Sequence, residues 1–419
     1  MKRLLIFIIF LVFQFNSEAQ SDTTQKIIEG RKNSSEQQQK PYVILISADG
    51  FRYDYIEKHN AKSLLSLGKE GLRAESMIPC FPTYTFPNHY SIVTGLYPAH
   101  HGLVNNSFYD HRKKKIFSMR NNETVKDGSW YGGVPLWVLA EKQQMLTASF
   151  YWVGSEAKIL GIQPTYSFNY NKDIPIDRRI QIVIEWLQLP PDIRPHLITF
   201  YFVEVDDAGH SYGPDARQTG ESVRWLDSSI QKLTDVVKAT GLPVNFIFVS
   251  DHGMTTIDTV NTLSIPAAVD TGKFIIPRGG ELVELYAKNK NDIMPTFNKL
   301  KKSASGFTAY LKAGIPKRLH YNTKHDRMNR IGDILLLPAW PKVFSFSGRK
   351  PNPGSHGYDP HLVTEMDAVF LAWGPAFKSR LKVPAFENVN VYPVITKILG
   401  LTYTHKIDGT TKLAEKILK

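Results

Sequence analysis

Apolar runs of strand length recur along the chain and alternate with segments of helical periodicity. The apolar runs cover Tyr42–Ala48, 148–153, 196–205, Val244–Val249 and 368–372. The helical patterns cover 61–69, 177–187, 222–238 and Val391–Leu399. A strand that is apolar at every position is buried on both faces, which is typical of parallel sheets. The alternation therefore predicts an α/β fold in which a mostly parallel central sheet is flanked by helices on both faces.

The first residues have the pattern of a secretory signal peptide. Met1, Lys2 and Arg3 give a charged start, an apolar run covers 4–15, and small residues precede Gln20. This run is too short to cross a bilayer comfortably, so export with cleavage near Ala19 is favoured over an uncleaved anchor. We therefore expect 1–19 to be a signal peptide and the mature protein to be periplasmic or secreted, without a stable membrane anchor.

Two further segments stand apart from the alternating strands and helices. Residues 20–40 are rich in Gln, Ser, Asn and Lys, which predicts a flexible lead-in. Residues 255–345 carry a strand pattern at 282–287 and a helix pattern at 292–301, which predicts a small inserted α+β subdomain. Together with this insertion, residues 41–419 form the predicted globular domain.

Cysteine usage and charge narrow the classes of partner. Cys80 is the only cysteine, so we expect neither an intrachain disulfide nor a disulfide-linked partner. The net charge is +12, and the basic residues are spread along the chain with small clusters at 113–115 and 299–302. Such an excess attracts anionic substrates, although it is also common on solvated surfaces. Because no nucleic-acid-binding motif accompanies the charge, a small phosphate-bearing substrate is favoured over DNA or RNA.

Three aspartates fall at the same place relative to the predicted strands. Asp49 follows Tyr42–Ala48, Asp206 follows 196–205, and Asp251 follows Val244–Val249 with one residue between. Ligands of open parallel sheets bind outside the carboxyl ends of the strands, so these carboxylates are expected to meet at one edge. Each acid alone also fits a turn or a helix cap, and only their common position favours a site.

Three histidines accompany these acids. His210 lies four residues after Asp206, His252 follows Asp251 directly, and His356 lies between Gly354 and Gly357 in a predicted loop. Carboxylate and imidazole are the ligands of catalytic zinc. Three Asp and three His therefore suit a pair of divalent metal ions.

Thr85 opens the stretch Thr85-Phe86-Pro87-Asn88-His89-Tyr90, where Pro87 suits the first turn of a helix. One interpretation is an N-cap, because threonine is favoured at that position. The other is an oxygen nucleophile, because a helix start stabilises a bound phosphoryl group. A threonine hydroxyl is a poor nucleophile at neutral pH, but zinc lowers the pKa of a bound water to about 7, and coordination activates a hydroxyl similarly.

Around these residues the chain resembles the nucleotide pyrophosphatase/phosphodiesterase family, the type I phosphodiesterases of the alkaline phosphatase superfamily. The resemblance covers nearly all of the mature chain, and its motifs are specific. It rests on residues 82–98, His101 with Gly102, 151–156, 161–164, 186–190, 206–214, 250–254 and 354–358. The family implies an alkaline phosphatase-like fold, so that 41–419 would be a catalytic phosphodiesterase domain.

The resemblance also implies roles for individual residues. Asp206, His210 and His356 would hold one Zn²⁺, and Asp49, Asp251, His252 and the Thr85 oxygen would hold a second. Asn106 matches the asparagine that hydrogen-bonds a phosphate oxygen. The aromatic residues that match the nucleobase pocket are Phe86, Tyr151, Tyr170 and Tyr201, although large rings also fill protein cores. Tyr84 departs from the pattern, since vertebrate nucleotide-cleaving members often carry lysine there.

We therefore expect a zinc-dependent phosphodiesterase that releases nucleoside 5′-monophosphates through a covalent threonine intermediate. A lysophospholipid or choline-ester phosphodiesterase and a phosphate monoesterase remain alternatives on the same metal core. A non-catalytic binding protein is disfavoured because every ligand position and the nucleophile are present. The stretch Cys80-Phe81-Pro82-Thr83 is similar to a sulfatase motif, but Tyr84 stands where that motif requires arginine.

Overall fold

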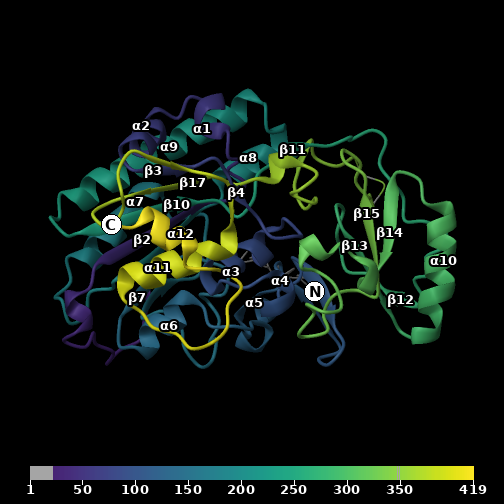
Figure 1. Cartoon of the computed structure of the whole chain (residues 1–419), viewed down its shortest axis with the longest axis horizontal. Helices are drawn as coiled ribbons and strands as arrows, with labels where there is room; N and C mark the ends of the chain where they lie inside the picture. The colour runs from purple at the N-terminus through teal and green to yellow at the C-terminus, as the bar shows by residue number, and fades with distance from the viewer. Residues whose placement is uncertain (1–21, 347, 349) are drawn as a thin grey trace, which may run out of the picture.

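A nine-stranded sheet forms the centre of the computed structural model, which describes residues 22–346, 348 and 350–419 (Figure 1). Within these residues β1 and β17 run opposite to the other seven strands, so the prediction of a mostly parallel sheet is confirmed. In spatial order the strands are β1 (Lys26–Ile27), β8 (Tyr166–Phe168), β7 (Thr147–Phe150), β9 (Leu197–Phe202), β2 (Tyr42–Ala48), β10 (Val244–Val249), β17 (Phe370–Trp373), β3 (Leu72–Ala74) and β18 (Leu381–Val383).

Strand β2 shows why both faces of the sheet are covered. Val43 and Leu45 belong to the core that includes α3 (Thr85–Thr94), α6 (Leu136–Lys142) and α11 (Val391–Leu399). Ile44 and Ile46 point the other way, because successive strand residues alternate between faces. They belong to the core of α2 (Lys62–Glu70), α7 (Ile176–Leu187) and α9 (Arg217–Lys238). An all-apolar strand thus matches helices on both sides, as predicted.

One strand boundary differs from the expectation in a way that concerns the site. The apolar run 196–205 is a strand only as far as Phe202, and α8 (Glu204–Tyr212) begins directly after it. Glu204, Asp206 and Asp207 lie in the first turn of α8, where negative side chains are stabilised by the helix dipole. Asp206 is therefore carried by the first turn of a helix rather than by a loop.

A second sheet lies beside the main body, at the right of Figure 1. Its antiparallel strands are, in order, β12 (Phe274–Ile275), β13 (Val283–Ala287), β15 (Ile334–Pro338) and β14 (Phe307–Leu311). One face packs with α10 (Ile293–Ser303) around Val283 and Leu285. The other face presents Tyr286 to the main core, so alternate residues of β13 serve two cores. This sheet lies within the span expected to hold an inserted subdomain.

Residues 22–40 do not form the free lead-in that their composition predicts. Lys26 and Ile27 pair with β8, and the buried Asn33 side chain accepts a hydrogen bond from the backbone of Leu146. The Asn33 amide also donates to the backbone carbonyl of Pro191. The segment departs from the expected flexible lead-in because β1 pairs with β8 and Asn33 bonds to main-chain groups just outside the strands. The predicted signal peptide lies outside the described residues.

Shorter elements connect the main ones. The helices are α1 (Tyr55–Lys58), α4 (Pro98–His101), α5 (Asn122–Lys126) and α12 (Lys412–Ile417). The strands are β4 (Met77–Ile78), β5 (Ser107–Asp110), β6 (Lys115–Ser118), β11 (Thr255–Thr256), β16 (Gly354–Ser355) and β19 (Phe386–Glu387). None of the helices in the described ranges is both long and apolar enough to cross a membrane.

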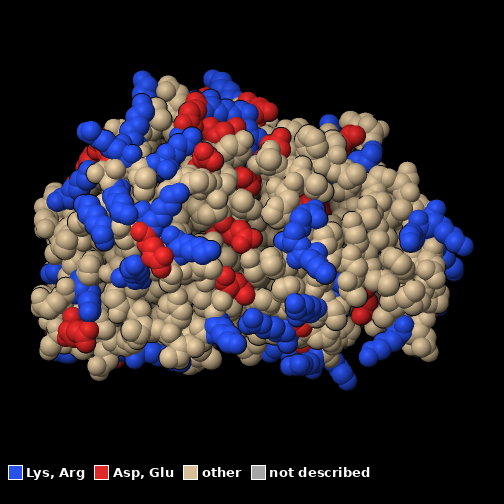
Figure 2. Space-filling model, viewed as in Figure 1, with Lys and Arg blue, Asp and Glu red and all other residues tan. Residues whose placement is uncertain are grey.

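Charge on the face shown in Figure 2 is distributed rather than concentrated. Lysine and arginine side chains are scattered over this face, with acidic residues between them. The excess of 51 basic over 39 acidic residues therefore does not form one continuous basic stripe on this face. A face with this excess of positive charge attracts small anions.

Candidate metal centre and active site

Three buried aspartates converge at the carboxyl edge of the main sheet. Asp49 directly follows β2, Asp251 follows β10, and parallel pairing of these strands brings the two acids together. Asp206, in α8, follows β9, which pairs with the other side of β2. Their exposed fractions are 1% for Asp49, 0% for Asp251 and 9% for Asp206. The structure thus brings together the three carboxylates that the strand pattern singled out.

The three predicted histidines join these acids. His252 Nε2 lies 2.9 Å from Asp251 Oδ2 and 3.4 Å from Asp49 Oδ1. His356 stacks on His252 with 3.5 Å between ring centroids, and its Nε2 lies 3.1 Å from His210 Nε2. Ligand atoms within 4.8 Å of one another form three groups that together include all six residues: Asp206 with His210 and His356, Asp49 with Asp206 and His252, and Asp49 with Asp251 and His89.

Gly354 allows His356 to reach this cluster from a distant part of the chain. A Cβ atom at Gly354 would lie 2.0 Å from the backbone oxygen of Gly209, so only glycine permits this approach to α8. The Gly354 carbonyl in turn accepts a hydrogen bond from His210 Nδ1 at 2.8 Å. The contact between β16 and α8 therefore places two of the imidazoles together.

All three imidazoles are held in the same protonation pattern. His210 Nδ1, His252 Nδ1 and His356 Nδ1 donate to the carbonyls of Gly354, Gly253 and Thr83, at 2.8, 2.9 and 2.8 Å. The lone pair of each ring is therefore on Nε2, and these atoms face the carboxylates. A hydrogen bond that fixes Nδ1 in this way is the usual support of a metal-ligating histidine.

The carboxylates also have oxygen atoms without hydrogen-bond donors. Asp49 Oδ1, Asp206 Oδ1 and Asp251 Oδ2 are buried and accept no hydrogen bond. Burial, together with the charge of Asp251, raises the pKa of Asp49 well above its usual range. Burial likewise raises the pKa of Asp206. Buried acids that repel one another need a cation, so the donor set fits divalent metal.

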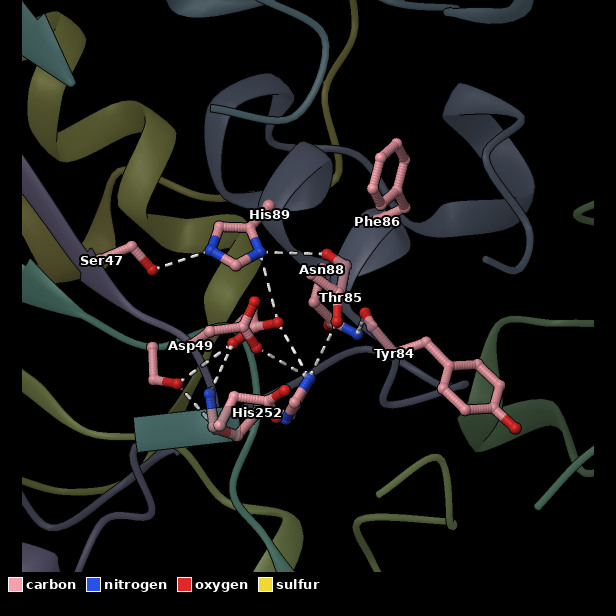
Figure 3. Close-up of polar contacts among 12 residues, drawn as sticks. Ser47, Asp49, Tyr84, Thr85, Phe86, Asn88, His89 and His252 are labelled. Atoms are coloured by element: carbon pink, nitrogen blue, oxygen red, sulfur yellow. Dashed lines mark hydrogen bonds and ion pairs between the residues drawn. The ribbon is translucent and has the colours of Figure 1, made fainter. Parts of the chain in front are cut away.

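The Thr85 side chain points into this cluster (Figure 3). Its Oγ1 lies 3.4 Å from His252 Nε2. Thr85 is the first residue of α3, and the N-cap is Tyr84, so the N-cap interpretation of Thr85 is wrong. The hydroxyl is therefore directed at the metal-binding groups instead of at the helix backbone.

Asn106 lies beside the start of α3. Its Oδ1 accepts a hydrogen bond of 2.9 Å from the backbone N–H of Phe86, the residue after Thr85. Since that bond requires an oxygen, the Nδ2 hydrogens of the Asn106 amide are left for another acceptor. The Asn106 amide is thus bonded to the residue next to Thr85, with its NH₂ group available to an acceptor.

The four predicted aromatic residues do not form one group. Tyr201 donates a 2.6 Å hydrogen bond to Asp49 Oδ2, and its ring centroid lies 6.0 Å from that of Tyr170. Tyr170 in turn contacts Tyr151 at 5.2 Å, and it is 45% exposed whereas Tyr151 is 3% exposed. Phe86 instead packs against Phe117. Tyr170 therefore offers the most accessible ring of the three tyrosines.

His89 belongs to the centre, although the sequence interpretation omitted it. It is fully buried, and its Nδ1 lies 3.1 Å from the carbonyl oxygen of Thr85 and 3.2 Å from Asp251 Oδ2. Ser47 Oγ lies 2.8 Å from its Nε2. The sequence spacing could have indicated His89, because residues four apart on a helix share a face and His89 lies four residues after Thr85.

Glu281 is a second residue that the sequence did not indicate. Its Oε2 accepts a 3.0 Å hydrogen bond from the hydroxyl of Tyr84, and its Oε1 accepts one from Ser355 Oγ. Glu281 thereby joins the residue before Thr85 to the residue before His356. Tyr84, which departs from the family pattern, is thus fixed by an acid from the segment between β11 and β16.

The fold and this acid–histidine centre define a member of the alkaline phosphatase superfamily. More closely, the chain belongs to the family described as type I phosphodiesterase / nucleotide pyrophosphatase, which matches residues 43–359. Murine ectonucleotide pyrophosphatase/phosphodiesterase 5 superimposes with a TM-score of 0.84 at 28% identity, over 91% of this chain and 100% of that one. The same murine protein is known in an inactive threonine-to-alanine form in complex with AMP.

Curated relatives agree with this assignment. The human ectonucleotide pyrophosphatase/phosphodiesterase family member 1 is 36% identical over 377 residues, which cover 86% of this chain and 40% of that protein. Venom phosphodiesterase 2 of Crotalus adamanteus is 35% identical over 373 residues, which cover 86% of this chain and 45% of the venom protein. The chain thus spans less than half the length of these relatives.

Proposed function

We propose that this protein is a zinc-dependent phosphodiesterase that cleaves phosphodiester or phosphoanhydride bonds of nucleotides and releases nucleoside 5′-monophosphates. The observation that carries the proposal is the Thr85 hydroxyl, 3.4 Å from His252 Nε2 at the edge of a buried acid–histidine cluster. Relatives described as pyrophosphatases and phosphodiesterases, and a murine relative in complex with AMP, support a nucleotide substrate.

Two sets of ligands would hold two Zn²⁺ ions. Asp206, His210 and His356 form the first set, and Asp49, Asp251, His252 and the Thr85 oxygen form the second. The mixture of imidazole and carboxylate donors suits zinc better than magnesium or calcium, which prefer oxygen ligands. When bound, the ions would supply positive charge that lowers the pKa of a coordinated hydroxyl or water and neutralises phosphate oxygens.

The chain's own residues then account for two displacements at phosphorus. Thr85 Oγ1 gives up its proton to solvent and attacks phosphorus, the bond to the leaving oxygen breaks, and a nucleotidyl-threonine phosphodiester forms. Water next attacks this diester, releases the nucleoside 5′-monophosphate and returns a proton to the threonine oxygen. Asn106 donates from Nδ2 to a non-bridging oxygen, where negative charge builds up in each transition state.

Tyr170 is the residue we expect to contact the nucleobase most directly. Its exposed ring contacts both the buried Tyr151 and the partly buried Tyr201, and Tyr201 also bonds to the proposed metal ligand Asp49. Phe86 would lie on the opposite side of a bound base. Base stacking between aromatic rings needs no particular base, so this arrangement gives preference for nucleotides rather than for one nucleotide.

We further propose that the protein is exported after cleavage near Ala19 and that 41–419 is the catalytic domain, with 255–345 as an inserted subdomain. The apolar run at 4–15 supports export. A small phosphodiester is the only partner that the proposed site needs. Mass measurement of the secreted protein would show whether its first residue is Gln20.

Substitution of Thr85 tests the nucleophile. Thr85→Ala should lower hydrolysis of a p-nitrophenyl nucleotide ester by at least about 10³-fold, while the zinc content per chain stays near that of the unchanged protein. Thr85→Ser, which keeps a hydroxyl, should retain measurable turnover. Undiminished turnover by Thr85→Ala would exclude Thr85 as the nucleophile.

A substrate panel tests the class of substrate. One preparation is compared on a dinucleotide, a nucleoside triphosphate, glycerophosphocholine and a simple phosphate monoester. The proposal predicts that the dinucleotide and the triphosphate have the highest kcat/KM. A preference for glycerophosphocholine would indicate a choline-ester phosphodiesterase, and a preference for the monoester would indicate a phosphatase.

A further inference from the structure

Glu284 is a buried acid that the proposed reaction does not use. It lies in β13 of the second sheet and is 2% exposed. Its Oε1 lies within hydrogen-bond distance of the Gly332 N–H and the Tyr321 hydroxyl, at 3.1 and 3.2 Å. Its Oε2 accepts a bond of 3.1 Å from Asn105 Nδ2. An acid from the second sheet thus reaches the residue before Asn106.

Hydrogen bonds on either side of Asn106, one to its backbone and one to its side chain, connect Glu284 to the start of α3. Asn105 is 3% exposed, and its Oδ1 accepts a 2.7 Å bond from the backbone N–H of Asn106. Asn106 Oδ1 in turn accepts the 2.9 Å bond from the backbone N–H of Phe86. Phe86 directly follows Thr85, so the series ends beside the hydroxyl.

The direction of each bond in this series is determined. The two backbone N–H groups can only donate, so each requires a side-chain oxygen, and the NH₂ group of Asn105 must then face Glu284. A carboxylate at position 284 accepts the bond from this NH₂ group. If position 284 carried an amide instead, the NH₂ group of that amide would face either the NH₂ group of Asn105 or the Gly332 N–H, and two donors would point at each other.

We propose that Glu284 and Asn105 are positioning residues that fix the orientation of the Asn106 amide toward the phosphate oxygen. This inference rests on the proposed function, because Asn106 acts only if a phosphoryl group is bound there. It also gives the second sheet a role, since β13 then contributes to the alignment of the catalytic groups.

Energetics support this assignment. Burial raises the pKa of Glu284 to about 7, although hydrogen bonds from Gly332 and Asn105 oppose that rise. An apolar residue in the same place would avoid the cost of burying a carboxyl group. An apolar residue, however, would leave Asn105 Nδ2 without an acceptor, and the Asn105 amide would then be free to turn.

Glu284→Gln is the direct test, because it preserves shape and changes only the pattern of donors and acceptors. We expect kcat for a p-nitrophenyl nucleotide ester to fall about 10- to 100-fold, below the 10²- to 10³-fold expected for complete loss of a transition-state donor. KM should change less than about threefold, since the Asn106 contact strengthens in the transition state. An unchanged kcat would overturn the inference.

The double variant Glu284→Gln with Asn105→Asp restores the pattern. The carboxylate introduced at position 105 would accept from both the Asn106 N–H and the NH₂ group introduced at position 284. The amide oxygen at position 284 would then accept from the Gly332 N–H. We expect kcat to recover to within about fivefold of the unchanged protein. A purely structural role predicts no recovery, because the double variant still lacks the buried carboxylate at 284.

Further variants separate positioning from folding. In an Asn106→Ala background, Glu284→Gln should lower kcat less than about twofold, and an additive loss would overturn the inference. Asn105→Ala leaves Glu284 bonded to Gly332 and should lower kcat as much as Glu284→Gln does. It replaces Glu284→Gln as the test if that variant does not fold.

The matched control is Glu141→Gln, since Glu141 is a buried acid bonded to Thr147 and Thr165 away from the site. It should lower thermal stability but leave kcat unchanged.

Failure of this inference and failure of the proposed function give different results. If the unchanged protein does not hydrolyse nucleotide esters, the proposed function is wrong. If it does hydrolyse them and Glu284→Gln is equally active, only the positioning role is wrong.

Discussion

At the scale of single residues, His89 shows how the nucleophile and a metal ligand are held together. Its Nδ1 contacts both the carbonyl of Thr85 and Asp251 Oδ2. We predict that His89→Ala weakens zinc retention about 10- to 100-fold, as is typical when a group that orients a metal ligand is lost. Competition with a chelator measures the affinity. Equal retention by both proteins would show that Asp251 needs no such support.

Gly50 is the second residue with a direct consequence for the centre. Its φ is +65°, and an added Cβ would lie 2.8 Å from Asp206 Oδ1 and 3.1 Å from Asp206 Cα. Gly50→Ala should therefore displace Asp206 and lower both the zinc content and the activity. The matched control is Gly241→Ala, which has φ +72° but no atom within 4 Å of the added Cβ. That control should lose only about 1 kcal/mol of stability and remain fully active.

At the scale of elements, His101 links α4 to the helix that carries Thr85. Its Nε2 donates to the carbonyl of Pro87, its Nδ1 accepts from the backbone of Leu103, and burial lowers its pKa to about 3. Because the unfolded chain binds a proton below about pH 6.5 and the folded chain does not, stability should fall as the pH drops from about 6.5 toward 3.

The magnitude approaches about 1.4 kcal/mol for each pH unit in that window. Urea unfolding at pH 7, 6 and 5 measures the slope. His101→Gln removes the titrating group, so the slope of this variant should be smaller by that amount. Parallel slopes for the two proteins would contradict the prediction. Above pH 7 the contribution of His101 should be constant.

The elements also show what sequence alone could predict. Long apolar runs such as Tyr42–Ala48 identified the buried strands, and the position of Asp49 and Asp251 after such strands identified the edge where the site lies. Strand β8 has three residues and leaves too short a pattern to detect. The contact of Glu284 with Asn105 joins β13 to the loop before β5, and neither local sequence indicates it.

At the scale of the whole molecule, the cluster of buried acids makes stability depend on bound metal. Asp49, Asp206 and Asp251 each have a buried oxygen that accepts no hydrogen bond. We predict that a chelator lowers the melting temperature by several degrees and that added zinc restores it, because ligands that bind only the folded state stabilise it. An identical melting temperature with and without chelator would show that metal does not bind these acids.

Asp49 is the first residue of the proposed ligand set along the chain, and His356 is the last. The chain must therefore be synthesised at least as far as His356 before any ion finds all of its donors. Partial chains that stop before His356 would capture zinc poorly, however well their early strands had formed. Loading with metal would consequently follow the docking of the segment that carries His356, and zinc uptake would report that this segment is in place.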